Sequence, residues 1–163
     1  MWNSIHLLAA RYVYAKLCKF LWSDNKKLKC VLPPSRRRKV SFVDVRDIAA
    51  VAVQTLTSND DSQHKGKAYT VTGGQALSYR QAAEILSKEV GKKIDYVNIS
   101  DEDARKAMNG MGMEERFIDG MMELYNIIIA GHLSQTTNTV EQIIGRKPIP
   151  FEQFARDNVK TFN

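Results

Sequence analysis

The chain has 163 residues, of which 44% are hydrophobic and 26% charged, as in an ordinary globular domain that can bury a real core. No apolar run approaches the roughly 20 residues that a membrane-spanning helix needs, and the first residues lack the basic-then-apolar order of a secretory signal. Cys18 and Cys30 have neither zinc nor disulfide-framework spacing, and His6, His64 and His132 are too scattered to be paired metal ligands. We therefore expect a cytoplasmic protein with reduced thiols, no membrane span and no metal site.

The net charge of +6 is concentrated near the start of the chain. Residues 1–40 hold ten Lys or Arg and one acid, whereas residues 41–163 hold 14 bases and 17 acids. The basic run from Arg36 to Lys39 follows two prolines, which favours an exposed, solvated turn over a contact with phosphate or another anion. Nucleic-acid binding is the weakest of the three interpretations, because no stacking platform or recognised nucleic-acid module accompanies the run.

The predicted elements begin with a helix over residues 3–22, where apolar residues recur at helical spacing. A short strand over 28–32 is stopped by the two prolines. A second strand over 40–45, rich in β-branched residues, leads directly into a helix that Asp44 or Asp47 can cap and that ends near Thr57. The inner face of this helix is expected to comprise Ile48, Val51, Ala52 and Leu56.

Downstream, we expect a strand over 68–72, a turn at Gly73 and Gly74, a helix over 78–90 that stops at Gly91, and a strand over 93–99. Further helices are predicted over 101–109, 114–131, 138–145 and 151–160. Strands separated by helices predict an α/β fold, with the edge of a parallel Rossmann-like sheet and a mainly helical C-terminal lobe. The chain is expected to be one domain that comprises a basic helix and turn (1–39), an α/β unit (40–99) and a helical lobe (100–163).

Three short motifs suggest nucleotide chemistry, but each has a simpler explanation. Tyr12 and Lys16 have the Tyr-x-x-x-Lys spacing of short-chain dehydrogenases, yet they lie too close to the strand at residue 40, which favours an ordinary helix surface. Gly110 and Gly112 follow a predicted helix rather than a strand, so a helix–helix turn is favoured over a phosphate loop. The pair at 73–74 follows a strand, but no Gly-Lys-Ser/Thr comes after it, which favours a turn.

The densest polar cluster beside a predicted strand comprises Asp44, Arg46 and Asp47. A helix cap with a local ion pair is the favoured interpretation; the alternative is a ligand site at the carboxyl end of a parallel strand, where open α/β sheets bind their ligands. Methionines at 108, 111, 113, 121 and 122 could line an adaptable pocket, but core filling is favoured. No catalytic acid, base or nucleophile can be assigned.

Several segments, in the same order, resemble the C-terminal half of NmrA-like proteins, which are atypical short-chain dehydrogenases/reductases. These segments are residues 42–49, 69–79 with Ala82 and Ala83, 91–97, and 145–148 with Phe151, Phe154 and Asp157. Together they cover about residues 28–163. Two features depart from the family pattern: the basic run at 36–39 replaces a glycine-containing turn, and the N-terminal dinucleotide fingerprint and the strands that follow it are absent.

The resemblance implies a Rossmann-type enzyme in which hydride passes from NAD(P)H to a planar acceptor in a cleft between two lobes. It places Trp2, Asn3 and His6 near the start of the family's cleft-facing helix, so these are the candidate substrate contacts; no cofactor-binding residue can be carried over. We expect the substrate-binding lobe of a quinone- or azo-type reductase, inactive without the missing cofactor half. The alternative is a non-enzymatic module that senses NAD(P) redox state or binds a protein partner. An uncovered sheet edge also predicts self-association.

Overall fold

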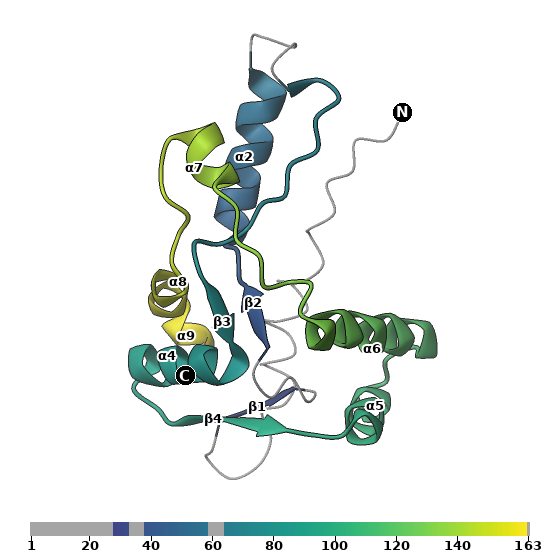
Figure 1. The fold of residues 1–163 in the computed structure, drawn as a ribbon. Coiled ribbons are helices and arrows are strands. Elements are labelled where there is room, and N and C mark those ends of the chain that lie inside the picture. The colour runs from purple at the N-terminus through teal and green to yellow at the C-terminus, as the bar shows by residue number, and fades with distance from the viewer. Residues whose placement is uncertain (1–27, 33–37, 59–63, 163) are drawn as a thin grey trace.

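The computed structural model describes residues 28–32, 38–58 and 64–162 (Figure 1). The predicted helix over 3–22 lies outside these ranges, as do the candidate contacts Trp2, Asn3 and His6 and the pair Tyr12 and Lys16. Within the described part, α2 (Val45–Thr57) stands at one end of the molecule and α5 (Asp101–Gly110) lies at the other, with short strands between them.

The strands form two small sheets of different kinds. β1 (Leu28–Leu32) pairs in parallel with β4 (Ile94–Asn98), which confirms the parallel sheet edge. β2 (Lys39–Ser41) pairs with β3 (Ala76–Ser78), but the two run antiparallel, with Val40 opposite Leu77. The described residues therefore combine a parallel edge with a separate antiparallel ribbon.

Two predicted strands differ from those observed. The strand predicted over 40–45 ends at Ser41, whose backbone N–H donates to the carbonyl of Leu133 at 2.8 Å, and Phe42 to Asp44 continue without a ladder partner into α2. The segment 68–72 is not a strand, although its β-branched residues suit one. Its contacts are instead to the Thr137 side chain and backbone, because strand propensity needs a neighbouring strand to pair with and the described residues supply none there.

The helices lie close to where the apolar periodicity predicts them. They are α4 (Tyr79–Val90), α5, α6 (Glu115–Ala130), α7 (Thr139–Ile144), α8 (Phe151–Asp157) and α9 (Val159–Phe162), in addition to α2. Ser78 and Gln81 form a capping box at the start of α4, and Gly91 ends that helix with φ at +72°. The helix predicted over 151–160 is interrupted at Asn158, which separates α8 from α9.

Two hydrophobic clusters hold these elements together. The larger one packs α4, α5, α6 and α8 around side chains such as Met108, Ile118 and Tyr125. The smaller one joins α2 to α7 and comprises Ile48, Val51, Val71 and Val140. Of the described helices, none is both long and apolar enough to cross a membrane.

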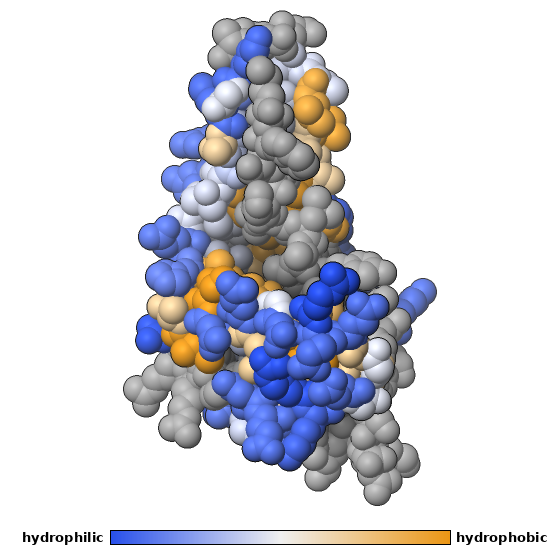
Figure 2. Space-filling view, turned by 90° about the vertical axis from the view of Figure 1, so that its right-hand side faces the viewer, coloured by the Kyte–Doolittle hydropathy of each residue, from blue (hydrophilic) through white to orange (hydrophobic). Residues whose placement is uncertain are grey.

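The buried face of α2 is shorter along the helix than predicted. Ile48 and Val51 are buried, but Leu56 is 80% exposed and Val53 is 60% exposed. The reason is length: α2 has 13 residues and its partner α7 has six, so at about 1.5 Å per residue α7 covers less than half of α2. Figure 2 shows the resulting apolar surface at the upper end of the molecule, at the height of α2 in Figure 1.

Candidate functional site

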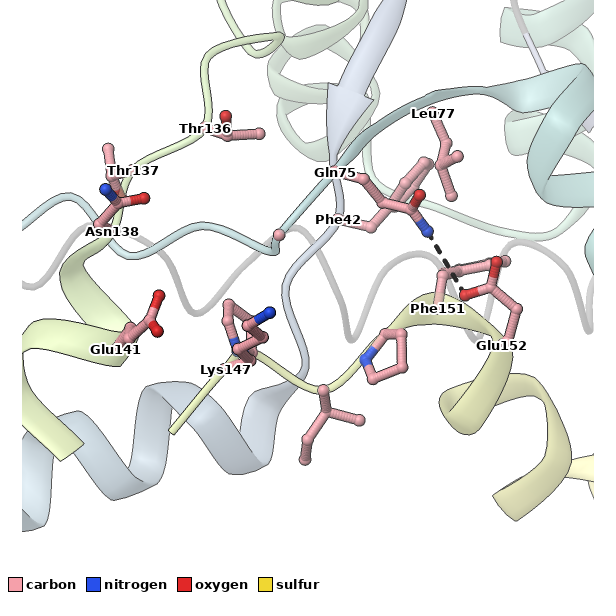
Figure 3. A pocket seen from close by; sticks show the side chains of 14 residues that line it. Phe42, Gln75, Leu77, Thr136, Thr137, Asn138, Glu141, Lys147, Phe151 and Glu152 are labelled. Atoms are coloured by element: carbon pink, nitrogen blue, oxygen red, sulfur yellow. Dashed lines mark hydrogen bonds between the residues drawn. The ribbon is translucent and has the colours of Figure 1, made fainter. Parts of the chain in front are cut away.

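A pocket with a volume of about 520 Å³ opens at the carboxyl end of β2. Four parts of the chain line it (Figure 3): Phe42 just after β2, the residues around β3, the approach to α7 with its first turn, and the extended segment that leads into α8. The lining residues are Phe42, Gly74, Gln75, Leu77, Thr136, Thr137, Asn138, Glu141 and 147–152. The volume lies within the roughly 300–1,000 Å³ typical of small-molecule sites, so this pocket is the candidate functional site.

One wall of the pocket is apolar and partly aromatic. The rings of Phe42 and Phe151 lie with their centroids 5.2 Å apart at an interplanar angle of 41°, and Leu77 is buried beside them. Pro148 and Pro150 hold the chain between them extended, because each proline disfavours helical backbone in the residue before it. The extended segment from Lys147 to Pro150 therefore forms a wall rather than another turn of helix.

The polar cluster Asp44, Arg46 and Asp47 lies directly behind this wall. Asp44 caps α2, and its carboxylate accepts from the Arg46 backbone N–H at 2.8 Å and from the same guanidinium at 3.0 and 3.1 Å. Arg46 Nη1 also lies 2.7 Å from Oδ2 of Asp157, at the end of α8. The hydrogen bonds from Arg46 and Gln153 hold the pKa of the Asp157 carboxyl below its ordinary value, and those to Asp44 and Asp157 raise the pKa of the guanidinium.

Asp47 holds the beginning of the extended segment that forms the pocket wall. Its side chain is fully buried, and one carboxylate oxygen accepts from the backbone N–H of Ile149 at 2.8 Å. The other oxygen lies 2.7 Å from Nη1 of Arg146, whose side chain is 45% exposed. The start of α2 thus holds the pocket wall at Arg146 and Ile149 and again at Asp157.

These contacts decide between the two interpretations of the cluster. The helix cap and local ion pair are confirmed, and the ion pairs extend to residues about a hundred positions away. None of the three side chains lines the pocket, so they position its wall rather than face its interior.

Threonine hydroxyls hold the opposite wall. The backbone N–H of Thr137 donates to Oγ1 of Thr72 at 2.7 Å, and Oγ1 of Thr137 donates to the carbonyl of Thr70, also at 2.7 Å. Thr72 is buried, so the first of these bonds is partly shielded from water, whereas the bond to Thr70 is exposed. The approach to α7 is thereby fastened to the segment 70–72, and this orients Asn138 and Glu141 at the pocket.

The glycine pair at 73–74 is a turn, as favoured from the sequence. A Cβ on Gly73 would lie 1.8 Å from the carbonyl oxygen of Phe42, so backbone already fills this space. Gly110 and Gly112 form the turn between α5 and α6, as expected. A dinucleotide needs a glycine-rich turn between a strand and a helix N-terminus. Among the described residues, no glycine-rich turn joins a strand to a helix N-terminus in this way.

The remaining candidates lie elsewhere. His64 Nδ1 is 2.8 Å from the Tyr69 hydroxyl, and His132 is exposed after α6. Met108, Met121 and Met122 are core residues, as favoured from the sequence. Among the described residues no group of His, Cys, Asp or Glu could hold a metal ion.

Sequence reasoning alone does not identify the polar side chains of the pocket. Gln75, Asn138, Glu141, Lys147 and Glu152 come from three separate stretches, and none belongs to a chemical motif. The available signal was the pair of prolines after Lys147, which predicts extended chain between two helices.

Comparison with known proteins places this geometry in context. The model of the NmrA-like family matches residues 7–155. The NAD(P)H azoreductase of Xenophilus azovorans is 43% identical over 129 residues, which are 79% of this chain and 44% of that protein. The chain therefore spans less than half the length of this curated relative.

Two solved structures share the fold. The NADPH-dependent quinone oxidoreductase of Escherichia coli, solved with NADPH, superposes with a TM-score of 0.71 at 21% identity, over 94% of this chain and 50% of that one. The triphenylmethane reductase of Citrobacter sp. gives a TM-score of 0.68 at 24% identity, over 81% of this chain and 44% of that one.

Proposed function

Because this chain belongs to the NmrA-like family, we propose that it is the acceptor-binding part of an NAD(P)H-dependent oxidoreductase of the quinone- and azo-reductase class. The planar acceptor lies in the pocket at the carboxyl end of β2. The observation that carries this proposal is the pocket itself: an aromatic and proline-lined wall faces polar side chains, and buried contacts hold both walls in place.

The cofactor belongs to a different part of the enzyme. Two observations support this: among the described residues no glycine-rich turn joins a strand to a helix N-terminus, and the chain matches less than half of its azoreductase relative. We therefore propose that the chain by itself binds the acceptor but does not turn it over. A cytoplasmic location is part of this proposal, since the spacing of its two cysteines suits a reducing compartment.

Acceptor binding can be tested with two glycine variants. A Cβ on Gly74 would meet only Pro148, at 3.8 Å, so Gly74→Leu places a side chain at the pocket without a backbone clash. Gly110 has no atom within 4 Å of a Cβ, so Gly110→Leu adds the same side chain away from the pocket. We expect 1,4-naphthoquinone, followed by isothermal titration calorimetry, to bind the parent chain and Gly110→Leu and to bind Gly74→Leu at least about tenfold more weakly.

Equal binding to all three proteins would place the acceptor elsewhere. NADPH fluorescence and quinone reduction are measured on the same samples. Turnover by this chain alone would contradict the proposed division of labour, and NADPH binding without quinone binding would favour a redox-sensing module instead.

A further inference from the structure

The charges that line the pocket are unequal in number. Glu141 and Glu152 contribute two carboxylates, and Lys147 is the one cation among the described lining residues. Gln75 Nε2 donates to Oε2 of Glu152 at 3.4 Å, which holds this carboxylate at the rim beside Phe151 (Figure 3). Within the described residues, no side chain forms an ion pair or hydrogen bond with the carboxylate of Glu141. The lining therefore carries a net charge of one negative unit.

The groups behind the wall do not reverse this sign. Asp47 and Arg146 neutralise each other at 2.7 Å. Arg46 forms ion pairs with both Asp44 and Asp157. One cation therefore faces two carboxylates, and this cluster has a net charge of one negative unit. An anion in the pocket would meet this field as repulsion and a cation as attraction, and the interaction weakens with distance and with salt.

The apolar wall favours a flat, delocalised ligand over a compact ion. A small hydrated cation gains little from Phe42, Leu77 and Phe151, because these side chains cannot replace its water. A planar aromatic cation can lay its ring on this wall while its charge faces the carboxylates. A cation is also attracted to the face of an aromatic ring within about 6 Å of its centroid.

We propose that the pocket prefers planar aromatic cations to neutral or anionic rings of the same size, and that Glu141 and Glu152 determine this preference. The inference rests on the proposed function, since it names the charge class of the acceptor that the pocket receives. Lys147 opposes the preference and limits its strength. Neutralising Glu141 and neutralising Lys147 must therefore shift cation binding in opposite directions.

Three acridines that differ mainly in charge provide the test: N-methylacridinium, acridine and acridine-9-carboxylate at mildly alkaline pH. Their fluorescence is titrated with the full chain and with Glu141→Gln, Glu152→Gln and Lys147→Met. Glu84→Gln is the matched control, because Glu84 is exposed on α4 and is not part of the pocket lining. We expect Glu141→Gln to weaken N-methylacridinium binding about twofold to fivefold and Lys147→Met to strengthen it by a similar factor, since each removes one exposed charge near the ligand.

Four results would overturn the inference. If acridine-9-carboxylate bound more tightly than N-methylacridinium, Lys147 would determine the charge preference of the pocket. Equal effects of Glu141→Gln and Glu84→Gln would show that only the net charge of the chain matters. If acridine binds and Gly74→Leu blocks it, but all pocket charge variants bind N-methylacridinium alike, the proposed function stands and this inference fails. If none of the three dyes nor naphthoquinone binds, both fail.

Discussion

Replacing Asp47 with alanine tests whether a buried carboxylate holds the pocket wall. The change leaves the backbone N–H of Ile149 without its acceptor, which costs about 1–3 kcal/mol. The pair with Arg146 adds no more than about 1 kcal/mol, because the guanidinium side chain is 45% exposed. We therefore expect Asp47→Ala to lower the free energy of unfolding by about 1–4 kcal/mol, a large part of the roughly 5–15 kcal/mol of an ordinary domain.

The amide variant separates the two contributions. Asp47→Asn keeps an oxygen that can accept from Ile149 and loses only the charge, so it should cost about 1 kcal/mol. The measurement is urea unfolding followed by far-ultraviolet circular dichroism. Asp119→Ala is the control, because Asp119 forms an exposed ion pair with Arg105 at 2.8 Å whose loss should cost less than about 1 kcal/mol.

If Asp47→Ala is no more destabilising than Asp119→Ala, the buried carboxylate does not hold the pocket wall. If Asp47→Asn and Asp47→Ala are equally destabilising, the hydrogen bond to Ile149 contributes nothing. A cycle with Arg146→Ala should give a coupling of about 0.5–1 kcal/mol, as for a half-exposed pair.

Three further predictions concern other positions. Gly73→Ala should lower unfolding stability by about 3 kcal/mol or abolish folding, since its Cβ would lie 1.8 Å from the Phe42 carbonyl oxygen; a change below 1 kcal/mol in urea unfolding would contradict the close approach. Arg46 holds the pKa of Asp157 below its ordinary value of 3.8. The ionised carboxylate therefore contributes to folding stability above pH 3.8, and this contribution is lost as the pH falls below 3.8. Asp157→Asn should therefore reduce the loss of stability in acid, measured as the denaturation midpoint against pH. Burial raises the pKa of Tyr79 above its ordinary 10.0, so stability should fall as pH rises past 10.0; Tyr79→Phe should weaken that dependence, and an unchanged alkaline profile would refute it.

Local chemistry in the sequence predicts most of the helices and their ends. Ser78 with Gln81, Ser100, and the glycines at 91 and 131 satisfy backbone groups within a turn of their own position, so the signals are complete in a short stretch. The parallel strand at 94–98 was predicted for the same reason, from apolar alternation between two clear stops. The interruption at Asn158 was not, because the periodicity of 151–160 continues through it.

Strand pairing depends on partners that are distant in the chain. The segment 68–72 has strand composition, yet its neighbour in the described structure is Thr137 and not another strand. Leu56 has the spacing of an inner-face residue but is exposed because α7 is too short to cover it. Composition indicates which secondary structure a segment can form, and the neighbouring parts of the chain determine which one it forms.

Local patterns in the sequence predict most of the helices, their caps and the polar cluster at the start of α2, since each depends on residues within a few positions of one another, and the family resemblance rests on several such segments in order. Only the tertiary structure decided that Asp47 reaches Arg146 and Ile149, that Thr137 is fastened to Thr70 and Thr72, and that Glu141, Lys147 and Glu152 share one pocket. The physical reason is that a buried carboxylate or hydroxyl must find a partner wherever the packed chain supplies one, and no local pattern records which distant backbone group that will be.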